Sequence, residues 1–147
     1  MARMIPPFDY DGDLPPGMHR TTWPEFKERF CAFASSDRRI DLGRRVEQMI
    51  EDARVAQVVD RIVFGGSFVT ASPGPNDFDC IVVLKPGTSY DNLQPFQRWV
   101  ADTREASRRY QSDVFVAKAD QPTLPVYLEF FSVNRRGKRV GLVEVIL

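Results

Sequence analysis

Residues 62–84 read Ile-Val-Phe-Gly-Gly-Ser-Phe-Val-Thr-Ala-Ser-Pro-Gly-Pro-Asn-Asp-Phe-Asp-Cys-Ile-Val-Val-Leu, and this stretch carries the pattern on which the predicted fold depends. A first apolar run ends at Gly65-Gly66-Ser67, and a second begins directly after Asp77-Phe78-Asp79. The pattern predicts a strand, a tight turn, a loop and a second strand. Because side chains alternate along a strand, the two carboxylates are expected on one side and Phe78 on the other.

The chemistry of this stretch indicates a site for a metal and a phosphate group. Two carboxylates about 7 Å apart on one side of a strand repel each other unless a cation lies between them. A glycine turn exposes backbone N–H groups to an anion, and Ser67 adds a hydroxyl donor. Together they suit a phosphate chain bridged by Mg²⁺, with two ions expected and Mn²⁺ as a substitute.

Length and composition set limits on the kind of protein. The 147 residues are 43% hydrophobic and 12% aromatic, which is typical of one globular domain. Twenty basic and 20 acidic side chains leave no net charge, so no overall field attracts nucleic acid. No apolar stretch approaches the roughly 20 residues of a membrane span. His19, Cys31 and Cys80 do not suit a structural zinc site, and a cytoplasmic location is expected.

Periodicity and turn residues predict an α+β fold, a mixed β-sheet flanked by helices. A single domain is expected over 1–147, with an extended N-terminal arm, 1–21, packed on it because its prolines oppose a helix. The segment 126–133 is ambiguous: it is interpreted as a strand that forms a hairpin with 140–147, and a short helix is the alternative. The other expected elements are helices over 23–34, 37–55 and 93–108, and strands over 58–64, 80–84 and 112–116.

Particular residues are expected to start the helices and to face the core. Thr22 and Glu25 suggest a capping box, and Trp23 a core anchor. In the second helix Ile40, Val46, Ile50 and Ala53 lie at helical spacing and are expected inside. The third helix is expected to begin after a cap at Asp91 or Asn92 and to turn Leu93, Phe96, Val100 and Ala106 inward.

The spacing of Gly66-Ser67, nine residues, then Asp77-Phe78-Asp79 before an apolar strand resembles the signature of the polymerase-beta-type nucleotidyltransferase superfamily. That resemblance implies a nucleotidyltransferase-like fold in which Gly65, Gly66 and Ser67 bind the nucleoside triphosphate. It also implies that Asp77 and Asp79 bind Mg²⁺. A third carboxylate on a later strand completes such a site. Asp113, at the head of Asp-Val-Phe-Val, is in the matching place, and Glu129 is the competitor.

Further motifs, among them Thr-Trp-Pro-Glu-Phe and Pro-Asn-Asp-Phe-Asp, resemble a family of small bacterial proteins of unassigned function that are regarded as nucleotidyltransferase-like. They are also similar to the minimal nucleotidyltransferases of toxin–antitoxin pairs. This implies transfer of a nucleotide to an RNA such as tRNA, a protein or a small molecule. The alternatives are a catalytically inert binding partner or antitoxin with a cognate protein partner, and an acidic-site phosphohydrolase with another fold.

Overall fold

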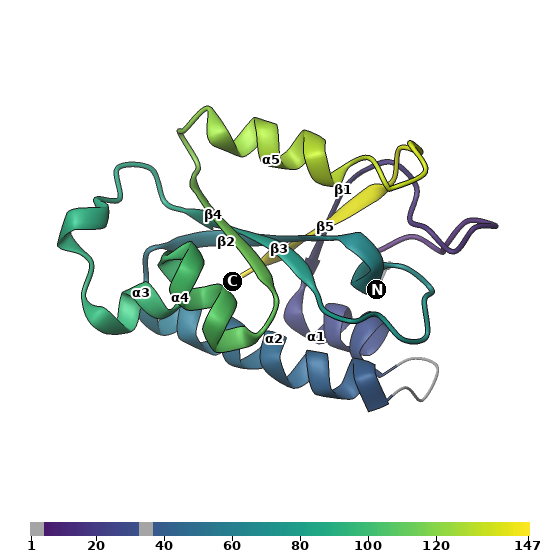
Figure 1. Ribbon diagram of the computed structural model, residues 1–147, viewed down its shortest axis with the longest axis horizontal. Coiled ribbons are helices and arrows are strands. Elements are labelled where there is room, and N and C mark those ends of the chain that lie inside the picture. The colour runs from purple at the N-terminus through teal and green to yellow at the C-terminus, as the bar shows by residue number, and fades with distance from the viewer. Residues whose placement is uncertain (1–4, 33–36) are drawn as a thin grey trace.

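A computed structural model describes residues 5–32 and 37–147, and its centre is a five-stranded sheet (Figure 1). The strand order is β1-β5-β2-β3-β4. The pairs β1–β5 and β3–β4 are parallel, whereas β5–β2 and β2–β3 are antiparallel. The predicted α+β fold with a mixed sheet is therefore confirmed. The strands are β1 (Gly17–Thr22), β2 (Val59–Gly65), β3 (Asp79–Leu84), β4 (Asp113–Lys118) and β5 (Gly141–Ile146).

Helices cover both faces of the sheet, and Figure 1 shows α5 alone on one face and α1 to α4 on the other. The buried side chains accordingly form two clusters, a large one under α1 to α4 and a small one under α5. Strand β3 contributes to both: Cys80, Val82 and Leu84 face the large cluster, while Ile81 and Val83 face the small one. This explains its unbroken apolar run, since both faces of the strand are covered. The helices are α1 (Trp23–Phe26) with a π-helical continuation (Lys27–Cys31), α2 (Asp37–Ala56), α3 (Pro95–Ala101), α4 (Thr103–Tyr110) and α5 (Thr123–Phe131).

The predicted hairpin over 126–147 is wrong, and the helical alternative for its first half is correct. Leu124, Tyr127, Leu128 and Phe131 recur at helical spacing, and this stripe of α5 packs on the sheet. The segment is so rich in apolar residues that an alternating pattern could be read in it as well. Strand β5 pairs with β1 and β2 instead, and the hairpin is reduced to one bridge between Val133 and Arg139.

The predicted helix 93–108 is divided into α3 and α4 by Asp102. The backbone of Asp102 is extended, and its carboxylate accepts a hydrogen bond from the Glu105 N–H at 3.0 Å, so it caps α4. The expected caps, Asp91 and Asn92, lie in a separate 3-10 turn, and Gln94 precedes α3. Val100 and Ala106 are buried as expected, but Phe96 is 39% exposed.

The N-terminal segment contributes a strand to the sheet. Residues 17–21 of the expected arm, together with Thr22, form the edge strand β1, and Ile5 and Leu14 are buried before it. The capping box at the start of α1 is wrong, because Thr22 makes no side-chain cap. Glu25 instead accepts hydrogen bonds from the Ile5 N–H and the Thr21 hydroxyl, both at 3.0 Å, and so ties this segment to the helix. The last two residues of the expected helix, 33–34, lie outside the described residues.

Helix α2 agrees with its predicted bounds but turns a different residue inward at its start. Val46, Ile50 and Ala53 are buried as expected, whereas Ile40 is 41% exposed. Arg39 takes the inward position and is fully buried.

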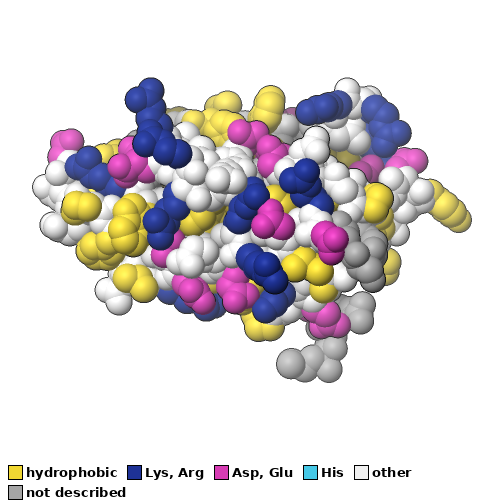
Figure 2. Space-filling model, turned by 60° about the horizontal axis from the view of Figure 1, so that its bottom comes forward, with side chains coloured by type: hydrophobic (Ala, Val, Ile, Leu, Met, Phe, Trp, Pro, Cys, Tyr) yellow, Lys and Arg dark blue, Asp and Glu magenta, His cyan; other side chains and the backbone are white. Residues whose placement is uncertain are grey.

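The surface carries charges of both signs. Figure 2 shows Lys and Arg side chains interspersed with Asp and Glu on the face formed by the helices below the sheet. Some of the arginines are paired with acidic residues, as in Arg45–Asp41 and Arg109–Asp52. Within residues 5–32 and 37–147, no helix combines the length and apolar character that crossing a membrane requires.

Candidate functional site

The sheet register brings three of the predicted site residues, Gly65, Asp79 and Asp113, into one row. Gly65 pairs with Asp79 across the antiparallel strands β2 and β3, and Asp79 pairs with Asp113 across the parallel strands β3 and β4. Asp79 and Asp113 are also the first residues of their strands. The row therefore lies at the edge of the sheet where β2 ends and β3 and β4 begin.

Three carboxylates converge at this edge. Asp77, Asp79 and Asp113 each offer a carboxylate oxygen, and the three oxygens lie within 4.8 Å of one another. Asp77 and Asp79 are partly buried and Asp113 is exposed. Hard oxygen ligands of this kind suit Mg²⁺ or Mn²⁺, so the donor set fits the expected metal. Among the described residues, none of the three carboxylates forms an ion pair within 4.0 Å.

Phe78 anchors the acidic residues to the hydrophobic core. Its ring is fully buried and lies 6.1 Å from the Phe64 ring and 6.2 Å from the Phe68 ring, centroid to centroid. Its backbone N–H donates to the Ser112 hydroxyl, and its carbonyl accepts from the Asp113 N–H, both at 3.3 Å. The same residue thus fixes Asp77 and Asp79 at the surface and joins them to the start of β4.

Burial and mutual repulsion make it unfavourable for these carboxyl groups to ionise when no cation is bound. Burial, then the charges of Asp77 and Asp113, raise the pKa of Asp79 to about 7. Burial and the charge of Asp113 also raise the pKa of Asp77. The positive charge of Arg135 offsets part of this rise in the pKa of Asp77 and of Asp79. A divalent cation among the carboxylates would relieve this repulsion.

The glycine turn lies directly against the carboxylates. Gly66 has φ +71°, and a Cβ atom at this position would collide with the Asp79 carboxylate. Only glycine therefore satisfies both the left-handed backbone and the close approach. Gly65 is buried, whereas Gly66 and Ser67 are exposed and begin a short 3-10 turn, Gly66–Val69. Among the described residues the Ser67 hydroxyl has no hydrogen-bond partner, so it can donate to a ligand.

Arg39 holds the loop that follows this turn, and it was not among the residues expected from the sequence. From α2, its guanidinium donates to the carbonyls of Phe68 at 2.8 Å, Thr70 at 2.7 Å and Ser72 at 2.6 Å. It also reaches the carbonyl of Phe30 at 2.8 Å. Burial lowers its pKa to about 10, so the group stays charged at neutral pH. In the sequence, the burial of Arg39 was indicated only by its spacing: it lies three residues, about one helical turn, before Leu42, which is buried.

The other candidate residues lie elsewhere. Glu129 is exposed on α5 and forms an ion pair with Arg139 at 2.6 Å. The His19 ring contacts the Pro15 carbonyl at 2.7 Å on the edge strand. Trp23 is partly buried and packs against the large core cluster. Cys31 and Cys80 are both buried and free, and Cys80 is in the core, as expected of a small apolar residue.

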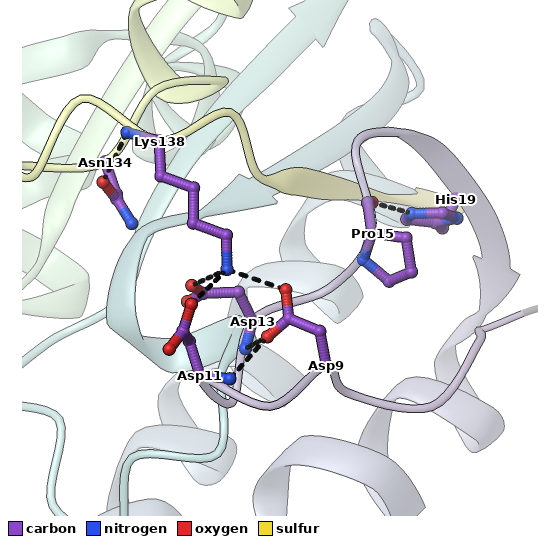
Figure 3. Close-up of polar contacts among 7 residues, drawn as sticks. All are labelled: Asp9, Asp11, Asp13, Pro15, His19, Asn134 and Lys138. Atoms are coloured by element: carbon purple, nitrogen blue, oxygen red, sulfur yellow. Dashed lines mark hydrogen bonds and ion pairs between the residues drawn. The ribbon is translucent and has the colours of Figure 1, made fainter.

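A second carboxylate cluster is bound by a lysine. Asp9, Asp11 and Asp13 surround the ammonium group of Lys138 at 2.8, 2.9 and 3.1 Å (Figure 3). The lysine comes from the turn between α5 and β5, so the contact joins the N-terminal segment to that turn. The spacing Asp-Tyr-Asp-Gly-Asp was visible in the sequence, but its distant partner was not.

Comparison with known proteins identifies a family but no characterised relative. A family described as a family of unknown function, DUF6932, matches residues 6–146, and the chain belongs to this family. Neither the curated proteins nor the solved structures contain a match. The family description assigns no activity, so the nucleotidyltransferase resemblance stays a prediction.

Proposed function

We propose that this member of the DUF6932 family is a Mg²⁺-dependent nucleotidyltransferase. It would move a nucleoside monophosphate from a nucleoside triphosphate to an acceptor hydroxyl on an RNA such as tRNA, on a protein or on a small molecule. The observation that carries the proposal is the convergence of Asp77, Asp79 and Asp113 beside the exposed Gly66-Ser67 turn. A cation-binding set of oxygens and a donor-rich turn at one sheet edge are what a metal-bound triphosphate requires.

Each residue has a defined role in this proposal. Asp77, Asp79 and Asp113 would hold one or two Mg²⁺ ions, which when bound activate the attacking oxygen and stabilise the leaving group. The backbone N–H groups at Gly65 and Gly66 and the Ser67 hydroxyl would bind phosphate oxygens. Arg39 would keep this turn in place through the carbonyls of the following loop. The chain thus contributes positioning and charge neutralisation.

The reaction balances without an additional reactant. The acceptor oxygen forms a bond to the α-phosphorus, and the bond from that phosphorus to the oxygen that bridges it to the β-phosphorus breaks. Pyrophosphate leaves, and the hydroxyl proton passes to solvent. We place this reaction in the cytoplasm, where free thiols such as Cys31 and Cys80 stay reduced.

Label transfer tests the proposal directly. The protein is incubated with Mg²⁺ or Mn²⁺, cell extract and each of the four nucleoside triphosphates labelled at the α-phosphate. We expect label on an acceptor with wild type and with Asp120→Asn, an exposed acidic residue outside the cluster, but not with Asp77→Asn or Asp79→Asn. Label from the γ-phosphate should not appear on that acceptor, because this phosphate leaves in pyrophosphate. Absence of both transfer and metal-dependent nucleotide binding in calorimetry would refute the proposal.

The second candidate is a catalytically inert protein of the same fold that acts as a binding partner or antitoxin. The outer face of α5 favours it, because Val126 and Phe130 are 65% and 70% exposed. Apolar side chains of this size are often buried in complexes. This candidate predicts no heat of nucleotide binding with Mg²⁺ and unchanged partner binding when Asp77 and Asp79 are both replaced by asparagine. A clear metal-dependent nucleotide affinity would contradict it.

A further inference from the structure

The turn between α5 and β5, residues 134–138, is well ordered by its own hydrogen bonds. The Asn134 side chain accepts from the N–H groups of Arg136 at 2.9 Å and Lys138 at 3.0 Å. The Asn134 N–H donates to the Lys138 carbonyl, and the Gly137 N–H donates to the Asn134 carbonyl, both at 2.9 Å. These bonds close the turn around one side chain, so Arg135 projects from a defined backbone.

Contacts outside the turn fix its position relative to the candidate site. The Lys138 ammonium group is held by the three carboxylates of the N-terminal loop, residues 9–13 (Figure 3). That loop also contacts the segment that follows the Gly66-Ser67 turn, because the Gly12 carbonyl accepts from the Ala71 N–H at 2.8 Å. The turn and the loop that follows Gly66-Ser67 are therefore attached to the same short segment.

Helix α5, which precedes the turn, places the turn near the site independently of the N-terminal loop. A Cβ atom on Gly65 would lie 3.2 Å from the Phe131 side chain, so the end of α5 packs against the end of β2. Arg135 follows four residues later, and Figure 1 shows this turn at the same end of the sheet as the loop after β2.

Arg135 has a charge available for a ligand. It is exposed, and it makes no side-chain hydrogen bond or ion pair with the residues that the structure describes. A bound triphosphate would add more negative charge than two divalent cations can neutralise together with three carboxylates. A guanidinium group beside the site, with its fork of N–H donors, suits the remaining phosphate oxygens.

We propose that Arg135 binds the phosphate chain of the triphosphate, and that the contact of Lys138 with Asp9, Asp11 and Asp13 positions Arg135 for this role. The inference rests on the proposed nucleotidyltransferase function and adds to it a binding residue and its support. Arg135 touches the substrate, whereas Lys138 is a positioning residue that acts through the turn.

The test compares Arg135→Ala with Arg136→Ala, its exposed neighbour in the same turn. Binding of inorganic tripolyphosphate, and of the four α,β-methylene nucleoside triphosphates, is measured by calorimetry with Mg²⁺. We expect Arg135→Ala to weaken binding at least about tenfold for each ligand, and Arg136→Ala to stay within about twofold of wild type. Equal affinities in the two variants would overturn the role of Arg135.

A metal-only measurement separates a charge effect from damage to the site. Binding of Mn²⁺ alone, followed by electron paramagnetic resonance, should be unchanged or a few-fold tighter in Arg135→Ala, because a nearby positive charge has been removed. Weaker Mn²⁺ binding in this variant would show a structural role and overturn the inference. A wild-type protein that binds Mn²⁺ but no triphosphate would instead refute the proposed function, and the inference with it.

A double-mutant cycle tests the positioning role of Lys138. Lys138→Met should weaken tripolyphosphate binding in the wild-type background and have little further effect in Arg135→Ala, because the two residues act through one contact. Additive losses would overturn the positioning role.

Discussion

Asp79→Asn is expected to stabilise the metal-free protein at pH 8, although it removes a proposed metal ligand. In the folded protein the pKa of Asp79 is raised from 3.8 to about 7, first by burial and then by the charges of Asp77 and Asp113. Ionisation of this carboxyl group is therefore unfavourable in the fold. Asparagine keeps the shape and carries no charge, and its amide can donate to Asp113.

The sign of the pH dependence follows from proton binding. Between pH 4 and pH 7 the folded state holds the Asp79 proton and the unfolded state has lost it, so the free energy of unfolding falls as pH rises. Above pH 7 the loss is complete. Asp79→Asn lacks this titration, so its advantage over wild type should be small near pH 4 and largest from pH 7 to 8.

The size of the effect has an upper limit. At about 1.4 kcal/mol per pH unit, a rise in pKa from 3.8 to about 7 corresponds to at most about 4 kcal/mol. Asp79 is only partly buried, and solvent screens part of the repulsion, so we expect about 1–2 kcal/mol. For a protein of this size that is a rise in Tm of roughly 3–6 °C.

Thermal and urea unfolding in EDTA, from pH 4 to pH 8, measure this difference, with Asp120→Asn as the control. Added Mg²⁺ should raise the Tm of wild type and leave that of Asp79→Asn unchanged, because only wild type keeps the full set of ligands. An Asp79→Asn protein less stable than wild type at pH 8 in EDTA would refute the reasoning. A stability difference that is independent of pH would refute it equally.

Three further substitutions have distinct expected outcomes. Gly66→Ala should lower the free energy of unfolding in urea by about 2 kcal/mol, because its Cβ atom would collide with Asp79. It should also weaken Mg²⁺–nucleotide binding in calorimetry. The control Gly74→Ala, whose Cβ atom has nothing within 4 Å, should change neither quantity. Arg39→Lys should cost about 2–3 kcal/mol in urea unfolding, since an ammonium group cannot reach all the carbonyls that the guanidinium bonds; wild-type stability would contradict this. Lys138→Met should speed amide hydrogen exchange over residues 9–13, and unchanged exchange would show that the three carboxylates do not need it.

The strands and most helices could be predicted because their signals are local. The apolar runs that became β2 and β3, and the helical spacing of α2, each lie within one short segment. The strand prediction for 126–133 was wrong because its apolar residues fit both the period of a strand and the period of a helix. Only packing of Leu124, Tyr127 and Leu128 on the sheet selects the helix. The break at Asp102 was missed because one carboxylate capping a new helix is a weak signal within a helical pattern.

For the candidate site, too, local features could be predicted from the sequence and contacts between distant residues could not. The sequence alone predicted the glycine turn and the acidic pair, because each lies at the end of an apolar run and strand ends lie at sheet edges. For the third carboxylate it offered Asp113, with Glu129 as the competitor. Only the tertiary structure decided that the three carboxylates converge, since their separation depends on the register of β2, β3 and β4. It also decided that Glu129 pairs with Arg139, that Arg39 lies under the turn, and that Lys138 joins the N-terminal loop to the turn of Arg135. These contacts join residues distant in the chain, and no local pattern encodes which distant side chains will meet.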